Sequence, residues 1–412
     1  MVISIITFNK DCIPHEVINI LDKIEQNGYK SYLVGGCLRD FIYGYIPNDW
    51  DITTDASLKE LLELFKDEVQ QYNTNNKSHE TITFKYNVNN IEITTFKNGC
   101  KDIFEDISKR DFTCNAIAYS YSSDSLIDIY ESIDNIKNKK IKFVNNPVDR
   151  IKEDPLRILR AFRFQSKYGW NIDDKDLDSI ITNKFLLKGI SAERIKSELD
   201  KILLGSFINK LDNFYFDSIL SFILPEINDD LANREYKKAL YIAIPNLIVK
   251  WSLLLQNVSI DNIKEICSRL RFDTDSTKDI LRVMYNKDFF ETNEVTIQSV
   301  RKLMSILDID SILNLLQFLQ AKYSSLDVVK ENNISKIYDT YKLIVKIKEN
   351  HDCISLKDMS VKGNDLIEFG YKGKEIGKAL NFLLNSIMED KIENDKDGLL
   401  MWLQVNDAIK DI

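Results

Sequence analysis

The chain has 412 residues, of which 44% are hydrophobic and 29% charged, and its formal net charge is −9. That length accommodates roughly two to four domains, and an acidic total excludes a protein that coats nucleic acid indiscriminately. No apolar run is long enough to span a bilayer, the first residues lack a secretory signal pattern, and the six cysteines form no C-x-x-C pair. We therefore expect a cytoplasmic, helix-rich protein without disulfides or a zinc site.

The first 140 residues alternate between helical and strand patterns. Helical spacing over 15–28 precedes a strand in YKSYLV (29–34), and Gly35-Gly36 separates that strand from an amphipathic helix in CLRDFIYG (37–44). The pattern then predicts, in chain order, a strand in DWDITT (49–54), a serine-capped helix over 57–69, and strands over 81–88 and 91–97 joined by a turn at Asn89-Asn90.

Beyond about residue 150 the spacing becomes helical, and from 216 to 412 we predict only amphipathic helices with polar joints. Between Lys137 and Lys167 there are ten Lys or Arg residues against three acidic ones, a local surplus of seven positive charges. Such a surplus is either a solvated helix face or the contact for an anionic partner. We expect an α+β head with a small sheet followed by an all-α remainder, divided into a head (1–140), a neck (141–215), a body (216–330) and a tail (331–412).

Two aspartates lie one residue apart in the predicted DWDITT strand. Asp49 and Asp51 would point to the same face of an extended strand, where the carboxylates repel each other unless a cation lies between them. A bare D-x-D is more often a solvated turn. Here, however, Gly35-Gly36 between a strand and a helix allows backbone N–H groups to approach a phosphate, and Arg39 follows one turn later to bind it.

Each feature alone has an ordinary explanation, a tight turn for the two glycines and a local ion pair for Arg39 and Asp40. Their order within 17 residues predicts a nucleoside triphosphate site with two divalent cations. Asp49 and Asp51 would hold Mg²⁺, because one ion lowers the pKa of an attacking hydroxyl and the other neutralises the departing pyrophosphate. Glu92, on a later predicted strand, is either a third carboxylate or an ordinary exposed residue.

Two later stretches combine charge with apolar runs. RDFTCNAIAY (110–119) predicts a helix start, capped by Asp111 or Thr113, before an apolar helical run. In EDPLRILRAFRF (153–164), Asp154-Pro155 is a natural cap and first residue of a helix. Every third residue is then an arginine, which gives Arg157, Arg160 and Arg163 as an oblique stripe along the helix. Beside a triphosphate site, such a stripe is hard to explain as ordinary solvated surface.

These stretches resemble the successive motifs of the class II tRNA nucleotidyltransferases, the CCA-adding enzymes and related bacterial poly(A) polymerases of the DNA polymerase beta superfamily. The resemblance rests on LVGGCLRD with DWD, on KRDFTCNAIAY (109–119) and on EDPLRILRAFRF. It continues through ERIKSELDKIL (193–203) and reappears in VKGNDLIEFGYKGKEIGKALNFLLNSIMEDKI (361–392), so it covers most of the chain. It implies a nucleotidyltransferase head followed by a helical neck, body and tail.

The resemblance also implies roles for single residues. Arg110 matches the position that contacts the triphosphate, Asp111 and Asn115 match positions near the sugar, and Asp154 and Arg157 match the pair that selects the incoming base. An Asp acceptor beside an Arg donor fits the amino group and ring nitrogen of cytosine and of adenine. Uracil and guanine present the reversed order, and each mismatch costs roughly 1–3 kcal/mol. A protein edge of this kind selects C and A without a nucleic-acid template.

The implied function is Mg²⁺-dependent transfer of cytidines from CTP, and in the fuller reaction also of adenosine from ATP, to the tRNA 3′ end. The helical half would hold the acceptor stem and upper arm of the tRNA by shape and phosphate contacts. We expect no membrane and no stable protein partner.

The connection over 97–109, anchored by Ile103, Phe104 and Ile107, is shorter than the flexible segment of relatives that build the whole CCA end, which favours addition of CC only. Two alternatives stay open, a bacterial poly(A) polymerase and a non-catalytic RNA-binding scaffold, and the acidic stretch at 388–398 speaks against the first.

Overall fold

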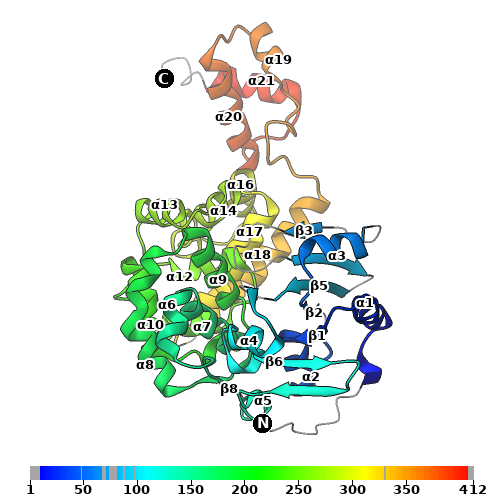
Figure 1. The fold of residues 1–412 in the computed structure, drawn as a ribbon. Helices are drawn as coiled ribbons and strands as arrows, with labels where there is room; N and C mark the ends of the chain where they lie inside the picture. Colours follow the sequence, from blue (N-terminus) through cyan, green and yellow to red (C-terminus); the bar gives the residue numbers. More distant parts are fainter. Residues whose placement is uncertain are drawn as a thin grey trace. The chain divides into compact units, whose positions relative to one another are not determined.

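A computed structural model of the chain describes residues 10–47, 49–66, 71–73, 81–86, 89–96, 99–328 and 331–406. The chain divides into two compact units, Met1–Ile223 and Leu224–Ile412. The first contains the sheet and the second is helical (Figure 1). The predicted domain boundaries at 140, 215 and 330 stay predictions.

A seven-stranded mixed sheet forms the centre of the head, in the order β3-β4-β5-β2-β1-β6-β7 (Figure 1). Neighbouring strands are antiparallel except β2 and β5, which are parallel. The predicted fold class, an α+β head with a small sheet, is confirmed. The strands are β1 (Ser31–Val34), β2 (Asp49–Thr54), β3 (Gln71–Asn73), β4 (Thr81–Tyr86), β5 (Asn89–Thr95), β6 (Ile117–Ser120) and β7 (Ser125–Asp128).

Helices cover both faces of this sheet, and the alternation along β2 decides which face receives the paired aspartates. Trp50 packs into the larger core cluster with side chains of the helices α1 to α3. Val34 packs on the opposite face with Ile107 of α4. Because successive residues of a strand alternate between faces, Asp49 and Asp51 point to the α4 side. The helices of the head are α1 (His15–Gln26), α2 (Gly36–Tyr43), α3 (Leu58–Leu64), α4 (Ile103–Ser108) and α5 (Ser132–Lys137), with 3₁₀ turns η1 (Lys10–Cys12) and η3 (Thr113–Asn115).

The helix predicted within RDFTCNAIAY is wrong. The 3₁₀ turn η3 is followed by strand β6, which lies between β1 and β7 and is buried at each of its four residues. A fully buried strand reads as a continuous apolar run, and periodicity alone does not distinguish that run from a buried helix. The stretch therefore ends a loop and begins a central strand.

The hairpin between β4 and β5 also differs from its prediction. Asn89 pairs with Tyr86 and Asn90 pairs with Lys85, so the two asparagines begin β5 and do not form the turn. Residues 87–88 lie outside the described residues. The serine cap is confirmed, because the Ser57 side chain accepts from the Glu60 N–H in a capping box. Helix α3 ends at Leu64, and residues 67–69 of the predicted helix lie outside the described residues.

The neck follows as short helices with one small parallel strand pair. Helix α7 begins at Arg157, two residues after the start that the Asp154-Pro155 pattern predicted, and Asp154 directly follows Glu153, the last residue of α6. The neck elements are α6 (Pro147–Glu153), α7 (Arg157–Tyr168), α8 (Asp174–Asn183), η4 (Lys184–Gly189), α9 (Ala192–Leu203), η5 (Ile208–Lys210) and α10 (Asn213–Ile223), with strands β8 (Lys140–Ile141) and β9 (Asn171–Ile172).

The second unit is all helical in its described residues, as predicted. Among the described residues of both units, no single helix has the length and hydropathy of a membrane span. Helices α16 and α17 meet these two criteria only when they are taken together, across a bend of 118°. The elements are η6 (Pro225–Ile227), α11 (Arg234–Ile242), α12 (Leu247–Leu254), α13 (Ile260–Arg269), α14 (Thr274–Tyr285), α15 (Phe289–Thr292), α16 (Ile297–Ile306), α17 (Ile309–Ser325), α18 (Glu331–Glu349), α19 (Gly363–Glu368), α20 (Lys374–Met388) and α21 (Lys396–Val405).

Candidate active site

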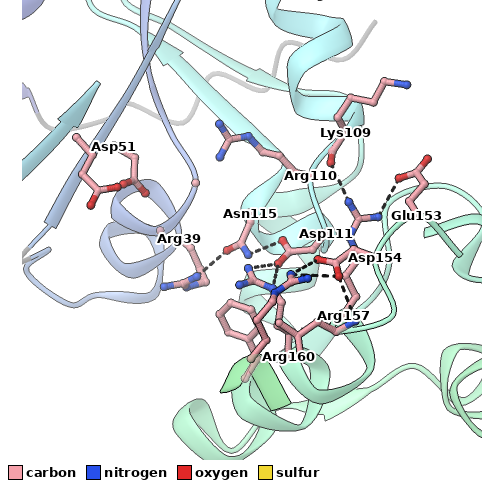
Figure 2. A pocket seen from close by; sticks show the side chains of 16 residues that line it. Arg39, Asp51, Lys109, Arg110, Asp111, Asn115, Glu153, Asp154, Arg157 and Arg160 are labelled. Atoms are coloured by element: carbon pink, nitrogen blue, oxygen red, sulfur yellow. Dashed lines mark hydrogen bonds and ion pairs between the residues drawn. The ribbon is translucent and has the colours of Figure 1, made fainter. Parts of the chain in front are cut away.

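A cavity of about 1000 Å³ lies within the first unit, lined by residues of β2, α2 and η3 from the head and of α6, α7 and α9 from the neck (Figure 2). Of the residues that the sequence predicted for the site, all except Asp49 and Arg163 line it. The fold therefore brings together motifs that are more than a hundred residues apart in the sequence.

Carboxylates gather on the β2 side of this cavity. Asp51 stands directly opposite Glu92 in the parallel pair of β2 and β5, so both side chains share one face. Burial, reinforced by Asp49 and opposed by Arg110 and Arg39, raises the pKa of Asp51 above its ordinary value. Burial and the charges of the two aspartates likewise raise the pKa of Glu92. This crowding of negative charge is what a cation at the site would relieve.

The described residues contain no preformed cage of three His, Cys, Asp or Glu side chains for a metal ion. A pair of strand carboxylates nevertheless fits Mg²⁺, because this ion is usually bound by one or two carboxylates together with substrate phosphates. Asp49 and Asp51 are such a pair, and Glu92 stands opposite Asp51 on the neighbouring strand, where both sequence readings of Glu92, a third carboxylate and an ordinary exposed residue, stay open.

Because Gly35 has no side chain, the guanidinium of Arg110 can lie close to the Gly35 backbone and near Asp51. Gly35 has a φ of +74°, and a Cβ there would lie 2.8 Å from Arg110 Nη1 and 3.5 Å from Asp51 Oδ2. Arg110 Nη2 donates to Oδ2 of the buried Asp106 at 3.2 Å, while the buried Nε of Arg110 has no hydrogen-bond partner among the described residues. Arg110 and Asp51 both line the cavity, and the positive charge of the Arg110 guanidinium suits an anionic ligand bound there.

The guanidinium of Arg39 is occupied by protein partners. Its Nε donates to Asp40 Oδ1 at 2.9 Å, Nη1 to Asn115 Oδ1 at 2.6 Å and Nη2 to the Tyr168 hydroxyl at 2.5 Å. It also stacks over the rings of Tyr168 and Phe164. Arg39 therefore ties α2 of the head to α7 of the neck, and its predicted contact with a phosphate stays a prediction.

A second set of hydrogen bonds extends this tie (Figure 2). Asn115 Nδ2 donates to Asp111 Oδ1 at 2.9 Å, and Arg160 Nε donates to Asp111 Oδ2 at 2.8 Å. Burial alone would raise the pKa of Asp111, but Arg160 and Asn115 hold it well below the ordinary value. A continuous network from Arg39 through Asp111 to Arg160 fixes the head against the neck.

The predicted base-selecting pair lies on the neck side of the cavity (Figure 2). Asp154 accepts from Arg194 Nη2 at 3.1 and 3.3 Å. Arg157 Nη1 donates to Glu153 Oε2 at 3.1 Å, and its Nη2 donates to the carbonyl of Lys109 at 3.3 Å. Both side chains are held in place while remaining at the cavity wall.

Sequence reasoning placed one arginine in this cavity that does not line it and gave no role to another that does. Arg163 turns away from the site and pairs with Glu198 of α9 at 3.3 Å. Arg194 lies in the ERIKSELDKIL stretch, where nothing in a single sequence indicates that one side chain of a distant helix reaches Asp154. The sequence shows Arg194 only as part of a stretch that resembles the family, and that resemblance assigns no role to this arginine.

Comparisons with known proteins cover most of the chain. Residues 31–142 match the family described as poly A polymerase head domain. Residues 169–231 match that described as probable RNA and SrmB-binding site of polymerase A, and residues 243–403 match that described as tRNA nucleotidyltransferase domain 2.

Curated relatives and solved structures agree with these matches. The CCA-adding enzyme of Lactobacillus helveticus is 27% identical over 409 residues (93% of this chain, 95% of the relative), and that of Bacillus pumilus is 25% identical over 411 residues (95% and 96%). The fold is similar to that of the Bacillus stearothermophilus CCA-adding enzyme in complex with CTP, with a TM-score of 0.78, 21% identity and coverage of 96% and 98%. For the Thermotoga maritima CCA-adding enzyme complexed with tRNA-CCA, the TM-score is 0.66, at 19% identity and 96% coverage of both chains.

The close approach of Arg110 to Gly35 gives a prediction with a matched control. In Gly35→Ala the new Cβ collides with Arg110, whereas Gly44→Ala introduces a Cβ at a φ of +98° with nothing within 4 Å. Both variants should lose about 1–2 kcal/mol of stability in thermal melts, because a side chain at positive φ is strained. Only Gly35→Ala should also weaken CTP binding, by about tenfold or more. Equal CTP affinity in the two variants would contradict this placement of Arg110.

Proposed function

We propose that the chain is a member of the class II tRNA nucleotidyltransferase family, a template-independent enzyme that transfers cytidines from CTP to the tRNA 3′ end with release of pyrophosphate. The observation that carries this proposal is the meeting, in one cavity, of the paired carboxylates of β2 and the Asp154–Arg157 edge of the neck. The first group suits phosphoryl chemistry and the second suits recognition of a base.

The family uses a divalent metal ion, and we propose Mg²⁺ held by Asp49 and Asp51. When bound, it would supply charge neutralisation for the triphosphate and a lowered pKa for the attacking 3′-hydroxyl. The crowded carboxylates of Asp51 and Glu92 support this assignment, because their mutual repulsion favours a bound cation. Arg110, held by Asp106, would direct its N–H donors to the triphosphate.

The base would be selected by the protein edge. The carboxylate of Asp154 accepts from the exocyclic amino group of cytosine, and the guanidinium of Arg157 donates to the adjacent ring nitrogen. Glu153 and the Lys109 carbonyl restrain Arg157, which reduces the entropy lost when a base binds. In uracil, an N–H would face the guanidinium of Arg157 and a carbonyl oxygen would face the carboxylate of Asp154, so neither hydrogen bond could form. This mismatch explains how the protein selects a base without a template.

The nucleic-acid partner we propose is the tRNA 3′ end, held along the acceptor stem and upper arm by the helical part of the chain. The matches to an RNA-binding segment at 169–231 and a tRNA nucleotidyltransferase segment at 243–403 support this. The cytoplasmic location expected from the sequence stays a prediction.

The number of nucleotides added is a separate question, for which two observations favour different answers. Within 97–109, Ile103 and Ile107 of α4 are buried in a core cluster, and buried Asp106 pairs with Arg110. A connection anchored in this way has little slack to reshape the pocket from C to A, which favours CC addition. The names of the curated relatives favour the whole CCA end.

Asp51→Asn should lower kcat for CMP addition by at least about a hundredfold, because it removes a charged ligand of the proposed Mg²⁺, the ion whose positive charge stabilises the reacting phosphates. Since burial disfavours this carboxylate, thermal melting without metal should show the variant at least as stable as the parent. Asp134→Asn, at an exposed position of α5 in the same head, is the control and should change neither quantity. Undiminished turnover of Asp51→Asn in Mg²⁺ would overturn the metal assignment.

Asp154 offers a test that separates base selection from helix capping, since its Oδ1 also accepts from the Leu156 N–H at 3.2 Å. Asp154→Asn keeps an oxygen that can accept from the Leu156 N–H. It also replaces a carboxylate, which only accepts hydrogen bonds, with an amide that both accepts and donates. We expect UMP or GMP incorporation to rise about tenfold relative to CMP in both Asp154→Asn and Asp154→Ala. If Asp154→Asn still selects C and only Asp154→Ala melts earlier, Asp154 is a cap and not a selector.

A tRNA that already ends in CC, incubated with ATP alone, decides between the two reaction lengths. The anchored 97–109 connection predicts that AMP addition is slower than CMP addition by about a hundredfold or more, because the edge must shift to keep both hydrogen bonds aligned for a larger ring. AMP addition at a rate comparable with CMP addition would instead establish a complete CCA-adding enzyme. Long adenosine tracts on RNA other than tRNA would point to a poly(A) polymerase.

A further inference from the structure

A second cavity, of about 510 Å³, lies beside the active site in the same unit and shares Arg39 and Phe164 with it. Its remaining cationic wall comes from Arg163 and Lys167 of α7 and from Lys201 of α9. The proposed chemistry at the carboxylates uses neither of these lysines.

The cations and two aromatic rings form one ordered stack. The rings of Phe164 and Tyr168 are stacked, with centroids 5.9 Å apart and an interplanar angle of 14°. Arg163 lies 5.0 Å from the Phe164 centroid and Lys167 lies 5.0 Å from the Tyr168 centroid. Arg39 lies over both rings, at 5.2 and 4.7 Å. Because α7 places positions three and four residues apart on one face, this arrangement is built into the helix.

Positive charge in this cavity exceeds the nearby negative charge. Glu198 is shared between Arg163 at 3.3 Å and Lys201 at 3.7 Å, and Asp40 pairs with Arg39. Lys167 makes no ion pair among the residues that the structure describes. Burial and the neighbouring charges of Arg39 and Arg163, opposed by the charge of Asp40, lower the pKa of Lys167.

The floor of the cavity is rigid. A Cβ on Gly205 would lie 2.5 Å from the carbonyl of Ser166, and the Phe207 N–H donates to that carbonyl at 2.7 Å. The turn after α9 is thereby packed directly against α7. This packing sets the end of α9, which carries Lys201, against α7, which carries Lys167.

We infer that this cavity binds a backbone phosphate of the RNA strand whose 3′ end reaches the carboxylates of β2, an inference that rests on the proposed function. A phosphodiester supplies the missing negative charge, and a contact to phosphate accepts any tRNA sequence. The same chemistry could bind the nucleotide triphosphate. The RNA strand is favoured because the cavity lies outside the one that holds Asp51 and the Asp154–Arg157 edge, so the triphosphate there would be separated from the reacting carboxylates.

The test uses the full chain with Lys167→Gln and Lys201→Gln combined, against Lys175→Gln, an exposed lysine of α8, as the matched control. Equilibrium binding of tRNA lacking its CCA end is measured over a series of salt concentrations, with the KM for CTP measured in parallel. We expect the double variant to bind tRNA about tenfold more weakly, with a slope of log affinity against log salt that is shallower by roughly 0.7–0.9 for each lost phosphate contact. The KM for CTP should not change, and Lys167→Arg should retain the parent's affinity.

Each other outcome has a definite meaning. Unchanged tRNA affinity and salt slope in the double variant would overturn the inference. A raised KM for CTP with unchanged tRNA affinity would assign the cavity to the triphosphate and also overturn it. A parent chain that neither binds tRNA nor extends it would contradict the proposed function itself, and this result is separate from any difference between the variants.

Discussion

The buried guanidinium of Arg39 is the contact on which the rest of the site depends. It joins Asp40 on its own helix, Asn115 in the loop before β6 and Tyr168 at the end of α7. A buried charge is tolerated only when it is paired and hydrogen-bonded, and removal of one partner typically costs about 3–5 kcal/mol. The arginine can therefore occupy this place only when head and neck are assembled around it.

This constraint explains how two distant groups cooperate. The carboxylates of Asp49 and Asp51 belong to the head, and Asp154 and Arg157, the pair that we propose selects the base, belong to the neck. Transfer requires the base and the reacting phosphate to be positioned within a fraction of an ångström of their productive geometry. The network through Arg39 and the one through Asp111 and Arg160 supply that alignment from side chains that need not touch the reacting atoms.

The sequence was informative wherever a local rule determines the structure. The DWDITT strand and the Ser57 cap follow from alternation and capping chemistry, and both were predicted correctly. The failures occurred where burial or distant contacts decide: β6 reads as a helix because both of its faces are covered. Arg163 fits the stripe but turns to Glu198, and Arg194 reaches Asp154 from a helix that begins nearly forty residues later. Periodicity carries no information about such partners.

The central claim is that the protein alone, without a template, distinguishes bases by one hydrogen-bonding edge. The most direct test is calorimetric binding of CTP, ATP, UTP and GTP to the chain in Mg²⁺ with no RNA present. CTP and ATP should bind at least about tenfold more tightly than UTP and GTP, since one mismatched buried group corresponds to about 1.4 kcal/mol or more. Equal affinity for all four nucleotides would contradict it.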